Sequence, residues 1–333
     1  MKNSRKYNTL DGLRTIACFG IIMMHMNANN KQYEIPGFIY NSMIPSLTNF
    51  VFLFMILSAF GICCGYYEKV FTNCFDPTEF YKRRYAKILP FFSFLVLLDL
   101  LISFSKNSVY EAIADVTLTF GLFPNDIQVI GVGWFLGVIF AFYMIFPFYC
   151  VLIATKKRAW IFLGISLILN YVCISYFGVG RENIVYSFCF FMAGGLVYLY
   201  RDHIQKIRWY ISVPLLLASI ILFYCVGGNA FTYLFVNGMF VILALGECGS
   251  FLENKFTHFI SEISLEMYLS HMVIFRAIEK LRLNTRFGNG LLQYVVTVLL
   301  VIGLDIIFAF AANRVINFCM THCDKGKNLG EGK

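Results

Sequence analysis

Ten separate apolar runs dominate the sequence, and each is close to the ~17–25 residues that an α-helix needs to cross a bilayer. Hydrophobic residues make up 59% of the chain and charged residues only 14%, against about 25% charged residues in an ordinary soluble domain. We therefore predict an all-α, polytopic integral membrane bundle of about ten transmembrane helices, and we exclude a soluble enzyme, a disordered chain and a disulfide scaffold. The expected spans lie at about residues 10–28, 45–66, 88–105, 132–154, 159–177, 184–200, 209–226, 231–246, 257–277 and 291–312.

The basic residues between these runs indicate how the chain is oriented. With the N-terminus inside, 19 of the 27 Lys and Arg residues fall in cytoplasmic segments and 6 in external ones. Because cytoplasmic loops carry an excess of Lys and Arg, we expect both termini in the cytoplasm of a multi-pass protein of the cytoplasmic membrane. The net charge of +8 is explained by these clusters, and no nucleic-acid partner is expected.

The runs leave no room for a second domain. We expect a single transmembrane domain over residues 1–315, a short cytoplasmic tail over 316–333 and no soluble extracytoplasmic domain. The short run at 112–123 ends before Pro124 and is expected to be interfacial or re-entrant. No metal site is expected, because Cys319 and Cys323 are a lone pair of possible ligands. The oligomeric state is left open.

The first span carries Asp11, Arg14 and His25, and ionisable side chains within a span are costly and mark functional sites. Arg14 and His25 are 11 residues apart, which places them about 20° from the same helix face and ~16 Å apart along the axis. We expect Arg14 at the cytoplasmic mouth, paired with Asp11, and His25 in the outer half. The alternative is that Arg14 only anchors the topology and His25 is interfacial.

A basic segment precedes the third span and includes Tyr81, Arg83, Arg84 and Lys87. Topology-setting charge next to an aromatic belt explains such a segment without any binding role. A more specific hypothesis is phosphate binding, because Arg84 and Lys87 are three residues apart and share a helix face. Two cations on one face can bind a pyrophosphate together.

The ninth span is unusually rich in hydrogen-bonding side chains. Ser264, Tyr268 and His271 share one helix face, while Glu262 and Glu266 share another. Such a span either lines a cavity or has its polar face satisfied by neighbouring helices. The single acids Asp99 and Asp305 lie in other apolar spans, and we expect them to be paired, with Arg276 as a candidate partner.

Six motifs in chain order resemble those of acyltransferase family 3, a family of membrane proteins. The match spans nearly the whole chain, from about residue 7 to 312. The motifs are Asp11-Gly12-Leu13-Arg14 running to His25, the aromatic run 52–60 with Ser58, the basic segment 81–90, Trp134 with Tyr143 and Pro147, the run 190–194 and the segment 263–271. This chain departs from the family in having Lys87 where an Arg is frequent and Ala59 where a Gly is frequent.

The resemblance implies transfer of an acyl group, usually acetyl, from cytoplasmic acyl-coenzyme A to hydroxyls, mostly of sugars in envelope or exported glycans and sometimes of lipid-linked molecules. It implies that His25 is the catalytic histidine, as a general base or through an acyl-histidine, and that Arg14 with Asp11 belongs to the same site. Arg84 and Lys87, flanked by Arg83 and Tyr81, would bind the coenzyme A phosphates.

The remaining candidates for the substrate site are Ser58, Trp134, Glu262, Ser264, Tyr268 and His271. Of these, Trp134 is suited to stack on a sugar ring. Two other functions remain open. A proton-coupled transporter would use intramembrane His, Glu and Asp as a relay, although the missing internal repeat disfavours it. A non-catalytic membrane partner in a glycan-assembly complex is the third hypothesis.

Overall fold

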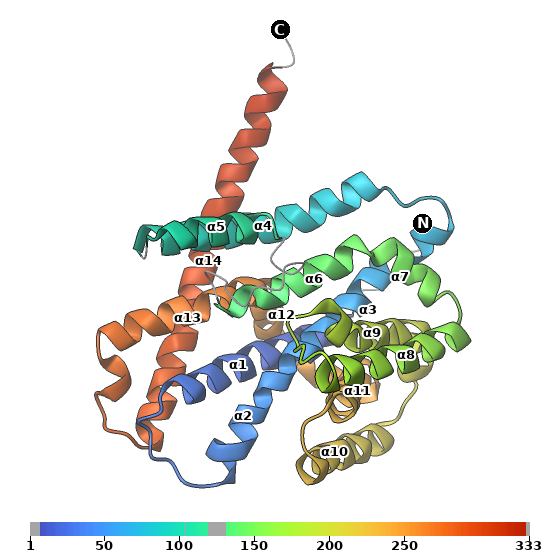
Figure 1. Ribbon diagram of the computed structural model, residues 1–333, viewed down its shortest axis with the longest axis horizontal. Helices are drawn as coiled ribbons and strands as arrows, with labels where there is room; N and C mark the ends of the chain where they lie inside the picture. Colours follow the sequence, from blue (N-terminus) through green and yellow to red (C-terminus); the bar gives the residue numbers. More distant parts are fainter. Residues whose placement is uncertain (1–6, 103, 119–130, 331–333) are drawn as a thin grey trace.

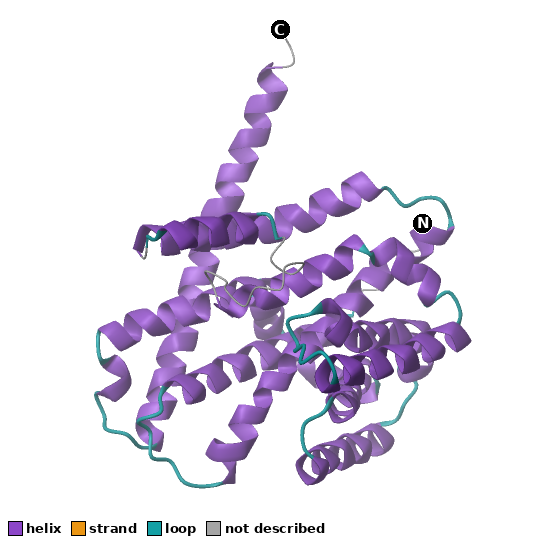
Figure 2. Ribbon diagram, in the orientation of Figure 1, coloured by secondary structure: helices purple, strands orange, loops and turns teal. Residues whose placement is uncertain are grey.

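The computed structural model describes the backbone of residues 7–102, 104–118 and 131–330. Within these ranges all regular structure is helical and no strand is present, which confirms the all-α prediction (Figure 2). Each of the ten predicted spans overlaps at least one helix. The helices are α1 (Thr9–Asn29), α2 (Ile44–Ser46), α3 (Phe50–Phe71), α4 (Pro77–Ile102), α5 (Lys106–Val116), α6 (Trp134–Met144), α7 (Phe146–Leu152), α8 (Lys156–Ser175), α9 (Ile184–Ile204), α10 (Trp209–Val226), α11 (Ala230–Leu245), α12 (Lys255–Glu262), α13 (Ser264–Lys280) and α14 (Leu291–Gly330).

Five helical stretches in the described part of the chain are long and apolar enough to cross a membrane, and α6 with α7, bent by 67°, makes a sixth if the pair is one span. These helices support a multi-pass membrane protein, while the count of ten spans and the cytoplasmic termini stay predictions. The five stretches are Ile39–Phe71, Lys156–Ser175, Ile184–Ile204, Trp209–Val226 and Leu291–Ile316.

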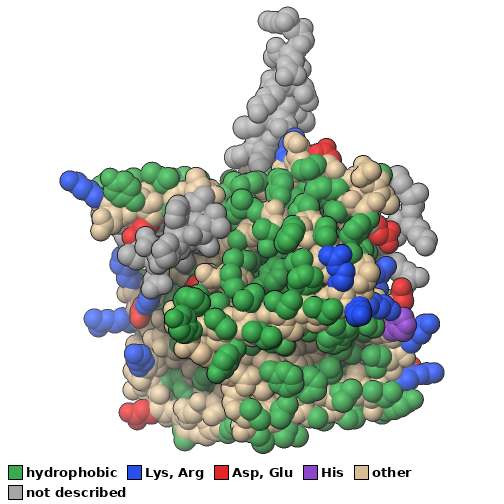
Figure 3. Space-filling view, turned by 45° about the vertical axis from the view of Figure 1, so that its right-hand side comes forward, with side chains coloured by type: hydrophobic (Ala, Val, Ile, Leu, Met, Phe, Trp, Pro, Cys, Tyr) green, Lys and Arg blue, Asp and Glu red, His purple; other side chains and the backbone are tan. Residues whose placement is uncertain are grey.

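The helices are arranged around α1 and α3, which run through the middle of the bundle (Figure 1). Helices α8 to α11 pack on one side, α13 and α14 lie on the other, and α14 extends beyond the bundle towards the C-terminus. Figure 3 shows a face on which hydrophobic side chains predominate and Lys and Arg lie mainly towards the margins. Such a surface suits contact with lipid at its centre and with water at its edges.

Two predicted spans are broken into two helices each. The span 132–154 breaks at Ile145, and α7 begins with Pro147 in its first turn, where the missing N–H of a proline costs nothing. The span 257–277 breaks at Ile263, between α12 and α13. The second break turns the polar residues of α12 towards the start of α1, and it thereby builds one end of the candidate site.

Two boundaries differ from the sequence-based expectation. Helix α14 continues to Gly330 and so includes residues 316–330 of the segment that is predicted to be a tail. Helix α5 ends at Val116, and the rest of the predicted interfacial run, 119–123, lies outside the described residues.

Candidate active site

A cavity of about 360 Å³ lies between α1, α3, α4, α6, α12 and α13, within the range of ~300–1,000 Å³ that is usual for ligand sites. One end is polar and the other is lined by aromatic and aliphatic side chains. The sequence-predicted site residues that line it are Asp11, Arg14, Ser58, Arg84, Lys87, Glu262, Ser264 and Tyr268. The structure thus brings together the first-span, basic-segment and ninth-span motifs, which are far apart in sequence.

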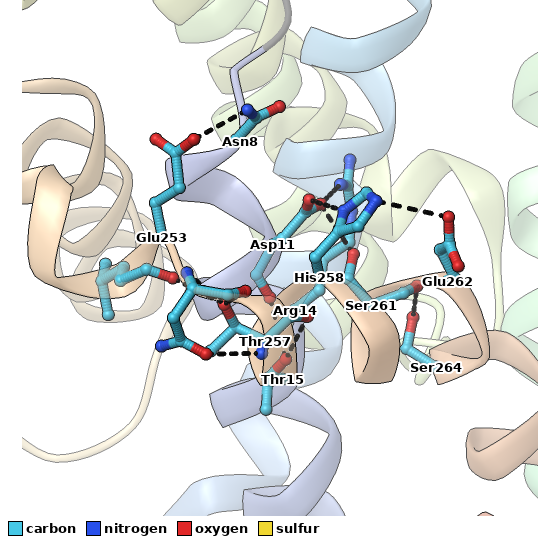
Figure 4. Close-up of polar contacts among 12 residues, drawn as sticks. Asn8, Asp11, Arg14, Thr15, Glu253, Thr257, His258, Ser261, Glu262 and Ser264 are labelled. Carbon is cyan, nitrogen blue, oxygen red and sulfur yellow. Dashed lines mark hydrogen bonds and ion pairs between the residues drawn. The ribbon is translucent and has the colours of Figure 1, made fainter.

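Asp11 organises the polar end of this cavity (Figure 4). One of its oxygens accepts hydrogen bonds from Arg14 Nη1 at 2.9 Å and Ser261 Oγ at 2.8 Å. His258 Nδ1 lies 2.9 Å from the other oxygen, and His258 Nε2 lies 3.4 Å from a carboxylate oxygen of Glu262. Asp11 therefore holds the predicted partner Arg14 and connects α1 to α12. The sequence reasoning missed His258, although its i,i+4 spacing to Glu262 was a usable signal.

Arg84 lies in the cavity wall within a cage of aromatic rings. Its guanidinium carbon is 5.4 Å, 5.6 Å and 5.7 Å from the ring centroids of Tyr66, Phe80 and Tyr143. Its Nε is buried and has no hydrogen-bond partner among the described residues. Ring faces stabilise a cation without neutralising it. The guanidinium of Arg84 therefore keeps its positive charge and its N–H donors for an anionic ligand. Lys87, one helical turn later, lines the same cavity.

The two other residues predicted in the basic segment point elsewhere. Arg83 forms an ion pair with Glu79 and is exposed, and the Glu79 carboxylate raises the pKa of the Arg83 guanidinium above its ordinary value. Tyr81 donates a hydrogen bond to Met144 O at 2.9 Å. Neither Arg83 nor Tyr81 lines the cavity, so the structure separates them from Arg84 and Lys87.

Three rings close the apolar end of the cavity, and we refer to Phe54, Phe135 and Tyr268 as the ring layer. Their centroids are 5.4 Å apart for Phe135 and Tyr268, 6.1 Å for Phe54 and Phe135, and 6.3 Å for Phe54 and Tyr268. The Tyr268 hydroxyl donates to Val132 O at 3.0 Å. The sequence indicated Tyr268 but neither phenylalanine.

His25 and His271 lie together beyond the ring layer, with ring centroids 5.0 Å apart. The His271 ring is 6.1 Å from that of Tyr268. Neither histidine lines the cavity. His271 is fully buried, and its Nε2 has no hydrogen-bond partner in the part of the chain that the structure describes. The structure therefore pairs the two predicted histidines and places one layer of rings between them and the cavity.

Trp134, predicted to stack on a sugar, is buried, and the guanidinium of Arg181 lies 5.1 Å from its ring centroid. Arg181 Nη1 also donates to Thr48 Oγ1 at 2.8 Å. Arg181 thus occupies one face of the indole. The sequence reasoning counted Arg181 only as a topology charge and missed this contact.

The expected pairing of Asp305 with Arg276 is wrong. Asp305 accepts a hydrogen bond from Ser270 Oγ at 2.6 Å, because the two residues face each other across α13 and α14. Arg276 instead pairs with Glu279 at 2.7 Å, one turn along its own helix. Glu266, a buried acid of the ninth span, accepts a hydrogen bond from Asn313 Nδ2 at 3.0 Å.

The chain matches one known protein family over most of its length. A family model described as an acyltransferase domain, that of acyltransferase family 3, matches residues 7–311. The chain belongs to this family. The resemblance drawn from six motifs is thereby confirmed, and with the apolar helices it identifies a multi-pass membrane acyltransferase. A search of curated proteins and one of solved structures found no match.

Proposed function

We propose that this acyltransferase moves an acetyl or other short acyl group from cytoplasmic acyl-coenzyme A to a hydroxyl of a sugar in an envelope or exported glycan, free or lipid-linked. The observation that carries the proposal is the polarity of the cavity, with Arg14, Arg84 and Lys87 at its polar end and apolar walls that lead to the ring layer, beyond which His25 lies. Membership in an acyltransferase family favours an enzyme over a transporter or a non-catalytic partner.

The cationic end suits the phosphates of coenzyme A. Arg84 retains an unneutralised guanidinium, Lys87 adds a second charge from the same helix face, and Arg14 stands opposite with its charge shared by Asp11. Hydrogen bonds between cations and phosphate oxygens are short and strong. Coenzyme A carries several such phosphates and cannot enter hydrocarbon, so it stays at this end of the cavity.

The pantetheine arm would then extend into the apolar part of the cavity. Leu57, Leu136 and Ile139 line its walls, while the hydroxyls of Ser58 and Ser264 lie within it and can bond to the amides of the arm. Ligand sites of this kind combine apolar walls with a few polar groups that fix orientation. The thioester would reach the ring layer, one helical turn below the histidine pair.

The reaction that these groups support is nucleophilic attack by a sugar hydroxyl on the thioester carbonyl carbon. A new C–O bond forms, the C–S bond breaks, and coenzyme A leaves as a thiolate. His25 accepts the hydroxyl proton and returns it to the thiolate, so that the base is regenerated. In a variant, the His25 nitrogen attacks the thioester carbonyl carbon, so that a C–N bond forms, the C–S bond breaks and coenzyme A leaves as a thiolate. The sugar hydroxyl then attacks the acyl-histidine, the C–O bond forms as the C–N bond breaks, and the hydroxyl proton passes to the thiolate.

The test compares His25→Ala with His203→Ala, a substitution of an exposed histidine at the end of α9. Transfer of radiolabelled acetyl from acetyl-coenzyme A into glycan and lipid-linked fractions of membranes that contain the protein is the readout. We expect His25→Ala to lower the rate about 10²–10⁴-fold, the usual contribution of a positioned general base, with donor binding and thermal stability retained. His203→Ala should behave as wild type. A stable His25→Ala protein with a near-normal rate would refute the assignment and make His271 the next candidate.

A further inference from the structure

We infer that the ring layer of Phe54, Phe135 and Tyr268 limits the length of the acyl group that the enzyme accepts. The inference rests on the proposed function, because it assumes an acyl-coenzyme A in the cavity. It adds to that function the side chains that restrict the acyl group to short chains.

The ring layer lies at the opposite end of the cavity from the charges. On α3, Gly61 is level with the polar end, since a Cβ on Gly61 would lie 3.9 Å from Arg14 Nη2. Phe54 is seven residues away along α3, or ~10.5 Å along the helix axis. On α13, Tyr268 is four residues beyond Ser264, or ~6 Å. The acyl end of a donor held by its phosphates would therefore point towards the rings.

The layer is held firmly in place. Tyr268 is 4% exposed and its hydroxyl is bound to Val132 O. Phe135 is 6% exposed and packs against Tyr268 at 5.4 Å and Trp134 at 6.2 Å. Close-packed side chains of this kind cannot shift to admit extra methylenes without a cost of about 1–3 kcal/mol. Phe54 is only half-buried, and it is the ring whose removal disturbs the fewest neighbours.

The length of the acyl chain also determines where its reacting carbonyl carbon lies. His271 is three residues beyond Tyr268, or ~4.5 Å along α13, and His25 pairs with His271. With an acetyl group, only a methyl lies between the thioester carbonyl and the rings, so the carbonyl can reach the ring layer next to which the histidine pair lies. A longer chain must hold the carbonyl further back, and an apolar pocket penalises each methylene that does not fit by about 10- to 200-fold in kcat/KM.

The test is a series of acetyl-, butyryl- and hexanoyl-coenzyme A with wild type, Phe54→Ala and Phe135→Ala. The matched control is Phe190→Ala, which removes a fully buried ring that stacks on Phe52 outside the cavity. We expect wild type to prefer acetyl over butyryl by at least about tenfold in kcat/KM. The preference should fall about tenfold or more in either ring-layer variant, and it should persist in Phe190→Ala even if its total activity drops.

Affinity for the same donors, measured by calorimetry on the purified protein, separates this inference from the proposed function. If donors bind without transfer to a glycan, the proposed function fails, and a length preference in affinity that Phe54→Ala abolishes still supports the ring layer. A wild type that binds no acyl-coenzyme A overturns both. Folded ring-layer variants that keep the wild-type preference overturn the inference alone. If Phe54→Ala does not fold, the smaller truncation Phe54→Leu serves in its place.

Discussion

At the scale of single residues, the two arginines of the cavity differ in what surrounds their positive charge. Arg14 donates to the Asp11 carboxylate at 2.9 Å, whereas Arg84 has the ring faces of Tyr66, Phe80 and Tyr143 around it. A carboxylate competes with a bound phosphate for the same guanidinium, and a ring face does not. Arg84 should therefore contribute more than Arg14 to the affinity for an anionic donor.

This difference yields a prediction for the donor site. Arg84→Ala should weaken binding of acetyl-coenzyme A by ~1.5–3 kcal/mol, or about 10- to 150-fold, the usual effect of losing a charge-assisted contact. Arg83→Ala, on the same segment but paired with Glu79 outside the cavity, is the control and should bind normally. Lys87→Arg should bind as well or better, because a guanidinium can form two parallel bonds to a phosphate. Calorimetry at low salt measures all three, and an unchanged affinity in Arg84→Ala would show that these cations only orient the protein.

A second residue-scale prediction concerns Asp11, whose carboxylate contacts Arg14, His258 and Ser261. Asp11→Asn keeps the shape but removes the charge, and an amide has only one acceptor oxygen. We expect a loss of ~1.5–3 kcal/mol in stability, seen as a lower melting temperature in detergent, together with weaker donor binding.

The control for Asp11→Asn is Glu253→Gln, which alters an exposed hydrogen bond from Asn8 and should change stability by less than about 0.5 kcal/mol. Equal melting temperatures for the two variants would mean that the Asp11 network does not stabilise the N-terminal end of α1.

At the scale of helices, the sequence predicts where helices occur but not how they break or how deep each one lies. Every span that was predicted from the length of an apolar run overlaps a helix of the structure. The breaks at Ile145 and Ile263 were not predicted, because both halves of each span keep a helical pattern. The ring layer draws single residues from three helices, and their common depth depends on packing between helices, for which no local pattern exists. Asp11 and Arg14, by contrast, are one turn apart on one helix, so local spacing was enough to pair them.

Packing between helices gives a prediction at this scale. Gly194 of α9 lies against α3, where an added Cβ would meet Ile56 O and lie 2.7 Å from Ala59 Cβ. Gly194→Ala should therefore force α3 and α9 apart and cost about 1–3 kcal/mol. Gly164→Ala is the matched control, because nothing lies within 4 Å of its Cβ position on α8, and alanine favours a helix by up to about 1 kcal/mol. Thermal unfolding in detergent should lower the melting temperature in the first variant and leave it equal or higher in the second.

At the scale of the whole molecule, the ionisable side chains of the site gather around a cavity inside the bundle, and several outer helices expose apolar side chains. Helices α1, α4, α12 and α13 carry the ionisable residues of the site, while α8, α10 and α14 expose large apolar side chains such as Ile168, Leu217 and Leu299. This distribution is the reverse of a soluble protein and is expected where lipid replaces water. It leaves the ends of the bundle, rather than its apolar sides, for polar molecules to approach the site.

The orientation of these two ends is the last prediction. The loops after α1 and α13 lie at one end of the bundle, because Asn284 Nδ2 donates to Asn30 Oδ1 at 2.9 Å and Glu34 N donates to Asn289 O at 3.0 Å. Reporter fusions after residues 32 and 285 must therefore agree, and the excess of Lys and Arg elsewhere predicts that both are external. Fusions after residues 70, 157 and 205 should read cytoplasmic, since Arg201 lies 4.0 Å from Glu68 and joins two of these segments at one end. Disagreement between the fusions after 32 and 285 would contradict the packing of α1 against α13. If both instead read cytoplasmic, the bundle would be inverted, and the cations around Arg84 would face away from the cytoplasmic supply of coenzyme A.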